Sequence, residues 1–569
     1  MSISGLNIGT GALSAYQVAL EVTGQNIANV NTPGYTRQRA RLVQAKELLR
    51  SFGAMGTGVR VQGIERIRDA FIDLEIRQQA SDVGSSETIA GMYERVESIF
   101  NEPSAVGINT LLGNFFDSLN DLANFPEDIG VRDTVALTAQ TLTNQMHIVN
   151  NELDQLRFDI DKTIQNSVTE INTLTRKIAG LNKEILKLET GRSGPANNLR
   201  DQREQTMKEL AALTEFSAHE AQTGEITVSI EGINVVFGDN SYDLGIQVMT
   251  GDELPVHEVV LANTGACINF SSGQMYGYFQ SRDVNIVNEI NNLDALSRAL
   301  IDEINEIHVD GRGVRGFSTI TSVNAVSDST ATLDSAGLNI TPVDTTFDIN
   351  VYDAGADTET SVNISVDVST DSLDDVATNI NTALTAQGIT EVTASVNANN
   401  ELVLTSSDTD FTFTFGNVTD NTNNFLSAMG LNTFFTGTDA SNVDVNALLL
   451  TSPEFMAAAM TNAPGDNSNA LRMADLRTSK VLDSNTRSIE DFYQANIVTL
   501  GAEVDRAQIE YEASSGFLTE LQLKREVTSG VNLDEEAANL IRFQRAYEAS
   551  ARYISVIDQI LNVLVNGLI

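Results

Sequence analysis

Apolar side chains recur every seven residues at both extreme ends of this 569-residue chain. This spacing aligns side chains on one face of a helix, so the sequence predicts a long helix at each end. The N-terminal positions are Leu6, Leu13, Leu20 and Ile27, with Tyr16, Thr23 and Val30 three places after the last three. The C-terminal positions are Leu533, Leu540, Tyr547, Ile554 and Leu561, with Phe543, Ile557 and Leu564 on a companion row.

Each terminal stripe needs a partner, because an apolar side chain contributes about 1.5–3 kcal/mol only when it is buried. The two helices could pack on each other within one monomer, or form a coiled-coil pair that then packs on neighbouring subunits. Glu21 is the only charged side chain before Arg37, whereas a solvated helix carries charges on its outer face. This favours the second arrangement. Asn532 followed by Glu535 predicts a capping box at the start of the C-terminal helix.

A third heptad tract predicts a continuous helix over residues 142–188, about 70 Å long at 1.5 Å per residue. Further helices are expected over 198–216, 284–308, 469–482 and 489–530, and strands within 224–238. The rows of the tract are Ile164, Ile171, Ile178 and Ile185, and Leu174, Leu181 and Leu188.

The composition changes sharply after Arg315, because no Lys or Arg follows until Arg472 while Asp and Glu recur. Apolar residues in this stretch alternate with polar ones, which predicts a folded insertion. The expected strands are 345–354, 360–369, 390–398, 400–406 and 411–417, around one helix at 372–387.

The sequence therefore predicts a multidomain α+β protein in which the two chain ends come together. Both ends form long coiled-coil helices, which surround a nested, mostly-β middle domain and an α+β outer insertion. The expected parts are paired terminal helices (1–34 and 530–569), a helical bundle-like domain (35–215 and 456–529), a mixed β/α domain (216–316) and an acidic outer domain (317–455).

Charge excludes some classes of function. The formal net charge is −42 and the pI about 4.3, which disfavours nucleic acid and anionic membrane surfaces, since both require clustered Lys and Arg. No run approaches the roughly 18 apolar residues that span a bilayer. No Lys or Arg precedes Arg37, so no secretory signal is expected at the N-terminus.

A search for catalytic or cofactor sites finds nothing credible. The run Gly311–Gly316 fits G-x-G-x-x-G, but a helical pattern precedes it and an extended one follows, the reverse of a nucleotide fold. The run Gly53–Val59 is expected to be a loop. The single Cys267 cannot form an internal disulfide. The histidines fit no metal motif; they are His147, His219, His257 and His308. From these observations together, no enzymatic activity, metal or cofactor is expected.

The most specific stretch is "NIANVNTPGYTRQRARL" at residues 26–42. Pro33 favours an extended Thr32, and Gly34 permits the positive φ of a tight turn. The helix is thus expected to end here for local reasons. Arg37, Arg39 and Arg41 alternate, so one strand face is expected to be basic, either binding a partner carboxylate or lying in solvent.

This stretch resembles the N-terminal signature of flagellar rod, hook and hook-associated proteins. "GVNLDEEAANLIRFQRAYEASARYISVIDQIL" (530–561) resembles their C-terminal signature. "NNLRDQREQTMKELAAL" (197–213) and "NSNALRMADLRTSKVL" (467–482) resemble segments of the hook-associated members. The resemblance covers roughly residues 1–316 and 455–569.

The resemblance implies a non-enzymatic structural protein that joins the flagellar hook to the filament. Its terminal helices would form the inner tube of an axial assembly, and a turn would pack on neighbouring subunits. Alternatives are a hook or distal rod protein, or a secreted adhesin on a flagellar scaffold. The turn residues are Asn26, Asn29, Asn31, Thr32, Pro33, Gly34 and Tyr35.

The resemblance also implies partners and a location. The partners would be other copies of the chain, the hook protein, the next hook-associated junction protein and a cytoplasmic export chaperone bound to the C-terminal helix. The protein would be secreted by flagellar type III export without a cleaved signal. Its terminal segments would be disordered in the monomer, so a protease would trim both ends first.

Overall fold

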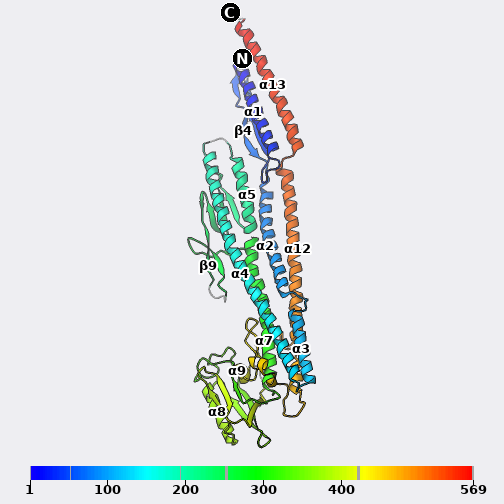
Figure 1. Cartoon of the computed structure of the whole chain (residues 1–569). Coiled ribbons are helices and arrows are strands. Elements are labelled where there is room, and N and C mark those ends of the chain that lie inside the picture. Colours follow the sequence, from blue (N-terminus) through cyan, green and yellow to red (C-terminus); the bar gives the residue numbers. More distant parts are fainter. Residues whose placement is uncertain (1, 51–52, 192–193, 250–253, 420–422, 567–569) are drawn as a thin grey trace. The chain divides into compact units, whose positions relative to one another are not determined.

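The computed structural model describes residues 2–50, 53–191, 194–249, 254–419 and 423–566. It confirms a multidomain α+β architecture with long terminal helices (Figure 1). The chain divides into two compact units: unit 1 (Met1–Met92, Phe158–Arg282 and Asp505–Ile569) and unit 2 (Tyr93–Arg157 and Asp283–Val504). This division does not test the four-part division expected from sequence, which stays a prediction.

Three long helices contribute residues to both units: α2, α4 and α12. The helix expected over 142–188 is one continuous element, and so is the helix expected over 489–530, while α2 fell outside every heptad pattern. Their bounds are α2 (Ala70–Phe100), α4 (Ile129–Glu189) and α12 (Ile489–Ser529).

The first part of unit 1 joins the two chain ends. Helix α1 (Ser2–Ala28) lies beside α13 (Leu533–Asn566), with both termini at the same end of the pair (Figure 1). Helix α1 also contacts the hairpin of β1 (Gln38–Gln44) and β4 (Val59–Arg66), whose strands pair antiparallel. The small hairpin of β2 (Leu48–Arg50) and β3 (Gly53–Met55) lies between these strands in sequence, so part of the loop expected at Gly53–Val59 is a strand.

The second part of unit 1 packs on α4. The row Ile164, Ile171, Ile178 and Ile185 is fully buried, whereas Leu188 at the end of the second row is 40% exposed. The other elements are α5 (Asn197–Leu213), β5 (Ser217–Glu220), β6 (Ile226–Ile230), β7 (Ile233–Phe237), β8 (Asn240–Ser241), β9 (Leu244–Val248), β10 (His257–Leu261) and α6 (Gly273–Gln280). Strands β5-β6-β7-β8 form one sheet and β9-β10 another.

Unit 2 contains α3, α7 and the acidic insertion. Phe115 of α3 packs against Phe434 and Phe435 at ring-centroid distances of 5.8 Å. Gly311–Gly316 follows a helix and precedes a strand, as expected. The elements of unit 2 other than the strands and helices of the insertion's sheets are α3 (Ile108–Asn124), a π-helical turn (Ser281–Asn285, its first two residues in unit 1), α7 (Ile286–Val309), α10 (Ala447–Thr451), a 3-10 turn (Pro453–Phe455) and α11 (Ser468–Asp475).

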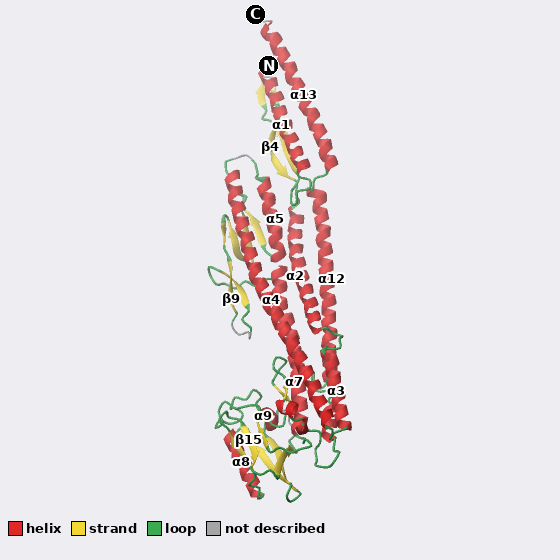
Figure 2. Ribbon diagram, viewed as in Figure 1, coloured by secondary structure: helices red, strands yellow, loops and turns green. Residues whose placement is uncertain are grey.

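The insertion is folded as its alternating pattern predicts, with strands and a helix gathered around one core (Figure 2). Two three-stranded sheets, β13-β12-β16 and β11-β15-β14, enclose apolar side chains together with α8. The bounds are β11 (Thr319–Thr321), β12 (Thr345–Asp353), β13 (Thr358–Val366), α8 (Leu373–Ala386), β14 (Val392–Val396), β15 (Leu402–Ser406), β16 (Phe411–Gly416), α9 (Phe425–Met429), β17 (Phe435–Thr436) and β18 (Asp444–Val445).

Candidate assembly site

The turn after α1 is built by its own backbone. Helix α1 ends at Ala28, so Val30 of the predicted stripe lies past its end. The Thr32 amide donates to the Asn29 carbonyl at 2.9 Å, and the Tyr35 amide donates to the Thr32 carbonyl at 3.2 Å. Gly34 has φ +77°, a conformation that costs a residue with a Cβ. Pro33 therefore lies on a tight, closed turn.

Asn26 holds the turn to the strand that follows it. This buried side chain donates from Nδ2 to the Gln38 carbonyl (2.8 Å) and to Glu536 Oε2 (3.0 Å). Its Oδ1 accepts from the Tyr35 hydroxyl (2.9 Å) and the Gln38 amide (3.0 Å). Both donor hydrogens and the acceptor oxygen are thus used. A carboxamide is required, because a carboxylate lacks the donors and a hydroxyl has only one.

Arg37 ties the same strand to the start of α13. Its guanidinium lies 2.7 Å from both Glu535 Oε2 and Glu536 Oε1, and its amide donates to the Ser529 carbonyl. Burial lowers the pKa of Arg37, but its hydrogen bonds to the two carboxylates outweigh burial and raise it. The arginines at and before β1 thus bind carboxylates of their own chain, whereas the sequence hypothesis was that they bind the carboxylate of a partner.

Asn532 caps α13 as predicted, but the capping box is not closed by Glu535. Asn532 Oδ1 accepts from the amides of Asp534 (2.9 Å) and Glu535 (3.3 Å). The Glu535 carboxylate binds Arg37 instead of returning to the cap. A local pattern was therefore overridden by an ion pair from the opposite end of the chain.

Asp201 on α5 anchors the turn from the other side. Its Oδ2 accepts from the Thr36 amide at 3.2 Å, and its Oδ1 accepts from Arg66 of β4 at 2.8 Å. Burial, then the charges of Asp201 and Glu536, raise the pKa of Tyr35 to about 12. Sequence reasoning missed Asp201, although it lies in the "LRDQREQ" segment singled out for its resemblance.

We name this set of contacts the joint. It comprises Asn26, Tyr35, Thr36, Arg37, Gln38, Arg66, Asp201, Glu535 and Glu536. The remaining turn residues Asn29, Asn31, Thr32 and Pro33 lie at its surface, where Asn31, Thr32 and Pro33 are exposed.

Small residues of α1 make its closest approach to α13. A Cβ on Gly9 would lie 2.5 Å from Cγ1 of Ile554, and one on Gly5 would lie 3.2 Å from Cδ1 of Ile557. Ala15, Ala19 and Asn26 are the most buried of the described side chains of α1. The predicted positions Leu6, Leu13, Leu20 and Ile27 are only half-buried. The heptad pattern thus found the helix but not the face that is most buried.

The predicted positions on α13 divide into two groups. Phe543, Ile554, Ile557 and Leu561 are half-buried, whereas Leu533, Leu540 and Tyr547 are exposed and not covered within the described chain. The side chain of Leu564 lies outside the described residues. The exposed large apolar side chains of α13 are Leu533, Leu540, Ile541, Tyr547, Tyr553, Val556, Ile560 and Val563. These residues lie on more than one side of the helix, and together we name them the exposed face of α13.

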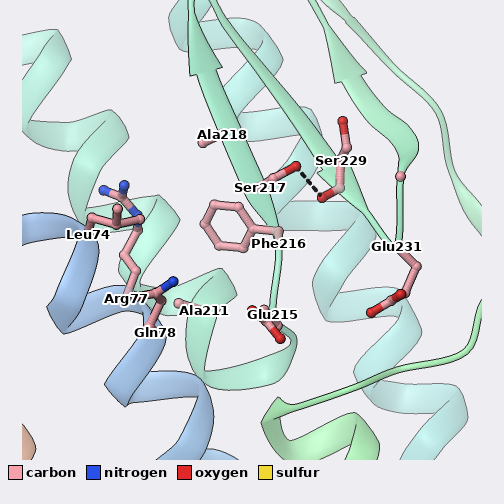
Figure 3. A pocket seen from close by; sticks show the side chains of 11 residues that line it. Leu74, Arg77, Gln78, Ala211, Glu215, Phe216, Ser217, Ala218, Ser229 and Glu231 are labelled. Carbon is pink, nitrogen blue, oxygen red and sulfur yellow. Dashed lines mark hydrogen bonds between the residues drawn. The ribbon is translucent and has the colours of Figure 1, made fainter.

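Unit 1 has two hollows of a size that could admit a small ligand. One, of about 370 Å³, lies beside the turn and is lined by Pro33, Tyr35 and the amides of α5. In the other, the Phe216 ring projects toward Leu74 and Arg77 of α2 (Figure 3). Arg77 is ion-paired with Glu204, so it is not available to an anion there. Neither hollow holds a nucleophile beside a base.

Two of the four histidines make contacts that hold parts of the fold together. His308 is buried, accepting from the Ala457 amide at 2.9 Å, and burial lowers its pKa to about 4. His257 binds Asp161 at 2.8 Å, and Cys267 is exposed. Among the described residues, no group of His, Cys, Asp and Glu could hold a metal ion. In that same part of the chain, no helix is long and apolar enough to cross a bilayer.

Four family models match the chain in consecutive segments. They are the flagella basal body rod protein (residues 6–36), the flagellar hook-associated protein FlgK helical domain (93–321), the flagellin hook IN motif (346–408) and the C-terminal part of the flagellar basal body rod FlgEFG proteins (527–567). The two rod-protein models match the ends that the joint connects.

Curated relatives match along the whole chain. Flagellar hook-associated protein 1 of Bacillus subtilis is 26% identical and covers 99% of this chain and 98% of its own length. The protein of that name from Escherichia coli is 27% identical and covers 99% of both chains. Along its whole length the chain is similar to proteins named flagellar hook-associated protein 1.

A solved structure agrees with the fold. The flagellar hook junction protein FlgK from Burkholderia pseudomallei aligns with a TM-score of 0.51 at 14% identity, covering 80% of this chain and 100% of its own. At this identity the match supports the fold alone. The similarity to flagellar hook-associated proteins rests on the full-length relatives and on the helical-domain match.

Proposed function

We propose that this protein is a structural subunit of the bacterial flagellum that joins hook to filament and catalyses no reaction. The observation that carries this is the joint, which links the two rod-like terminal signatures into one folded site. The full-length relatives named hook-associated protein 1 support it. The rod and hook alternatives are disfavoured, because residues 93–321 match a helical domain specific to hook-associated proteins. No comparison supports the adhesin.

The terminal helices supply the assembly surface in this proposal. The exposed face of α13 carries eight large apolar side chains, and their burial against neighbouring copies would contribute about 1.5–3 kcal/mol each. The surface residues of the turn, Asn31, Thr32 and Pro33, would meet the next subunit where the tube widens. Its similarity to flagellar hook-associated proteins supports assembly with other axial components of the flagellum.

More specific partners are part of the same proposal. The hook protein would contact one end of the ring, and the next hook-associated junction protein the other. A cytoplasmic chaperone would cover the exposed face of α13 before export, because such a face otherwise self-associates. Export would follow the flagellar type III route without a cleaved signal.

The test is deletion of the gene, with complementation by the full chain. A hook-to-filament adaptor predicts that the deletion strain completes its hooks but retains no filaments, and that the wild-type gene restores both filaments and swimming. Loss of the hooks themselves would make this a hook or rod protein. Unchanged filaments with lost surface attachment would favour the adhesin.

A further inference from the structure

We propose that Glu21 of one copy forms an ion pair with Arg542 and Arg545 of the adjacent copy, and that this contact fixes how neighbouring subunits pack. The inference rests on the proposed assembly of terminal helices, and adds to it the residues that select the neighbour. The partner is a second copy of this chain.

The register of the helix pair places these charges at one level. Gly9 lies against Ile554, and Asn26 binds Glu536, so the helices run antiparallel. Both helices rise about 1.5 Å per residue. Counting from either contact, Glu21 lies level with Ile541 and Arg542, and within about one turn of Arg545.

The charges nevertheless point away from each other within one copy. At about 100° per residue, Glu21 lies about 140° around α1 from Gly5 and Gly9, which face α13. By the same count, Arg542 lies about 120° and Arg545 about 180° around α13 from the side formed by Glu536 and Ile554. All three charged side chains are exposed. They therefore place an acidic group on the outer side of α1 and two basic groups on the outer side of α13, where Glu548 is also exposed.

No charge within the described chain neutralises these residues. Arg542 donates to Asn539 Oδ1 at 2.8 Å and lies 4.9 Å from the Phe543 ring centroid. Neither Arg542 nor Arg545 forms an ion pair in the described residues. Glu21 accepts a hydrogen bond from Gln17 at 3.1 Å. Exposed arginines without a carboxylate stand out in a chain of net charge −42.

The acidic group lies on α1 and the basic groups lie on α13. The α1 side of one copy can therefore bind the α13 side of the next, which is a head-to-tail contact. Such a heterologous contact repeats around a ring or along a helix, as a tube requires, whereas a two-fold contact would stop at a dimer. Charge complementarity suits this role, because it selects partner and register more than it adds affinity. Glu21 is the only charged residue of α1, so reversing its charge in a single substitution tests the interaction.

The experiment uses full-length protein expressed in the deletion strain, and measures the amount retained on purified hook complexes. The variants are Glu21→Arg, Arg542→Glu with Arg545→Glu, and the combination of all three. Each reversal places like charges together, and we expect a loss of about tenfold or more. The combination restores the pair and should return retention to within about twofold of wild type. Glu152→Arg, an exposed reversal on α4 of unit 2, is the matched control and should be retained like wild type.

Circular dichroism of the purified variants shows whether the fold is kept. Reversals retained like wild type would overturn the proposal, and so would a combination no better than its parents. Failure of wild-type protein to associate with hook complexes would instead overturn the proposed function itself. The two failures are therefore distinguishable.

Discussion

The side-chain amide of Asn26 donates a 3.0 Å hydrogen bond to Glu536 Oε2 across 510 residues of sequence. This bond joins the last turn of the first helix to the first turn of the last. Both groups are buried, so water cannot reach either of them to replace the hydrogen bond. Breaking the bond would therefore cost free energy of folding. The joint therefore forms only when both ends of the chain are present, which links the two terminal signatures physically.

Replacing Asn26 with Asp should open the joint. The change removes the donors to Gln38 and Glu536 and places a carboxylate beside another buried one. We expect a loss of about 3–5 kcal/mol of local stability. Hydrogen exchange of amides 26–38 measures it. Asn29→Asp, a matched change on the half-buried turn, should have little effect; equal protection in the two variants would contradict the account.

Arg37→Ala should destabilise the start of α13. It leaves Glu536, whose side chain is 2% exposed, without its cation, and such a loss costs about 3–5 kcal/mol. Adding Glu536→Gln removes the stranded charge, so the double variant should lose less than the sum of the two single losses. Arg41→Ala breaks an exposed ion pair with Glu65 and should cost at most about 1 kcal/mol. Additive losses in the cycle would show that Arg37 and Glu536 are not coupled.

Replacing each of two glycines of α1 with alanine should change the stability of the protein in opposite directions. Gly9→Ala puts a methyl group 2.5 Å from Cγ1 of Ile554 and should push α13 away. Gly24 has open space around its Cα, so Gly24→Ala should stabilise the helix by about 1 kcal/mol. Thermal unfolding followed by circular dichroism compares them. If Gly9→Ala also stabilised the protein, the close approach would be wrong.

The joint should weaken at alkaline pH. Burial and nearby carboxylates raise the pKa of Tyr35 to about 12, while an unfolded tyrosine titrates near 10. Between these values the unfolded chain releases a proton that the folded chain retains, so stability falls as pH rises from about 10 to about 12. A spectrophotometric phenolate titration, with Tyr35→Phe subtracted, should show this late group. In Asp201→Asn its pKa should fall; a Tyr35 that titrates near 10 in wild type would contradict the joint.

Much of the fold was readable from periodicity. Heptads located α1, α13 and the long α4, and strict alternation located the strands of the insertion. The apolar rows failed to identify the most buried face of α1, because Gly5 and Gly9 approach α13 by lacking side chains. Helix α2 was missed because no heptad row marks it.

Only part of the joint could be predicted from the sequence. Pro33 and Gly34 predict a turn, because the φ preferences of proline and glycine depend only on the residue itself and can be read from the sequence. The partners Asp201 and Glu536 lie 165 and 510 residues from the groups that they bind, and a local pattern carries no information on such pairing. Glu535 is an example. The spacing of Asn532 and Glu535 predicted a capping box, but the Glu535 carboxylate binds Arg37 instead.

The most direct test of the account is immunogold electron microscopy of isolated flagella, with antibody raised against the acidic insertion. We predict a single band of label where hook meets filament. Label along the whole hook, or label absent from the flagellum, would contradict it.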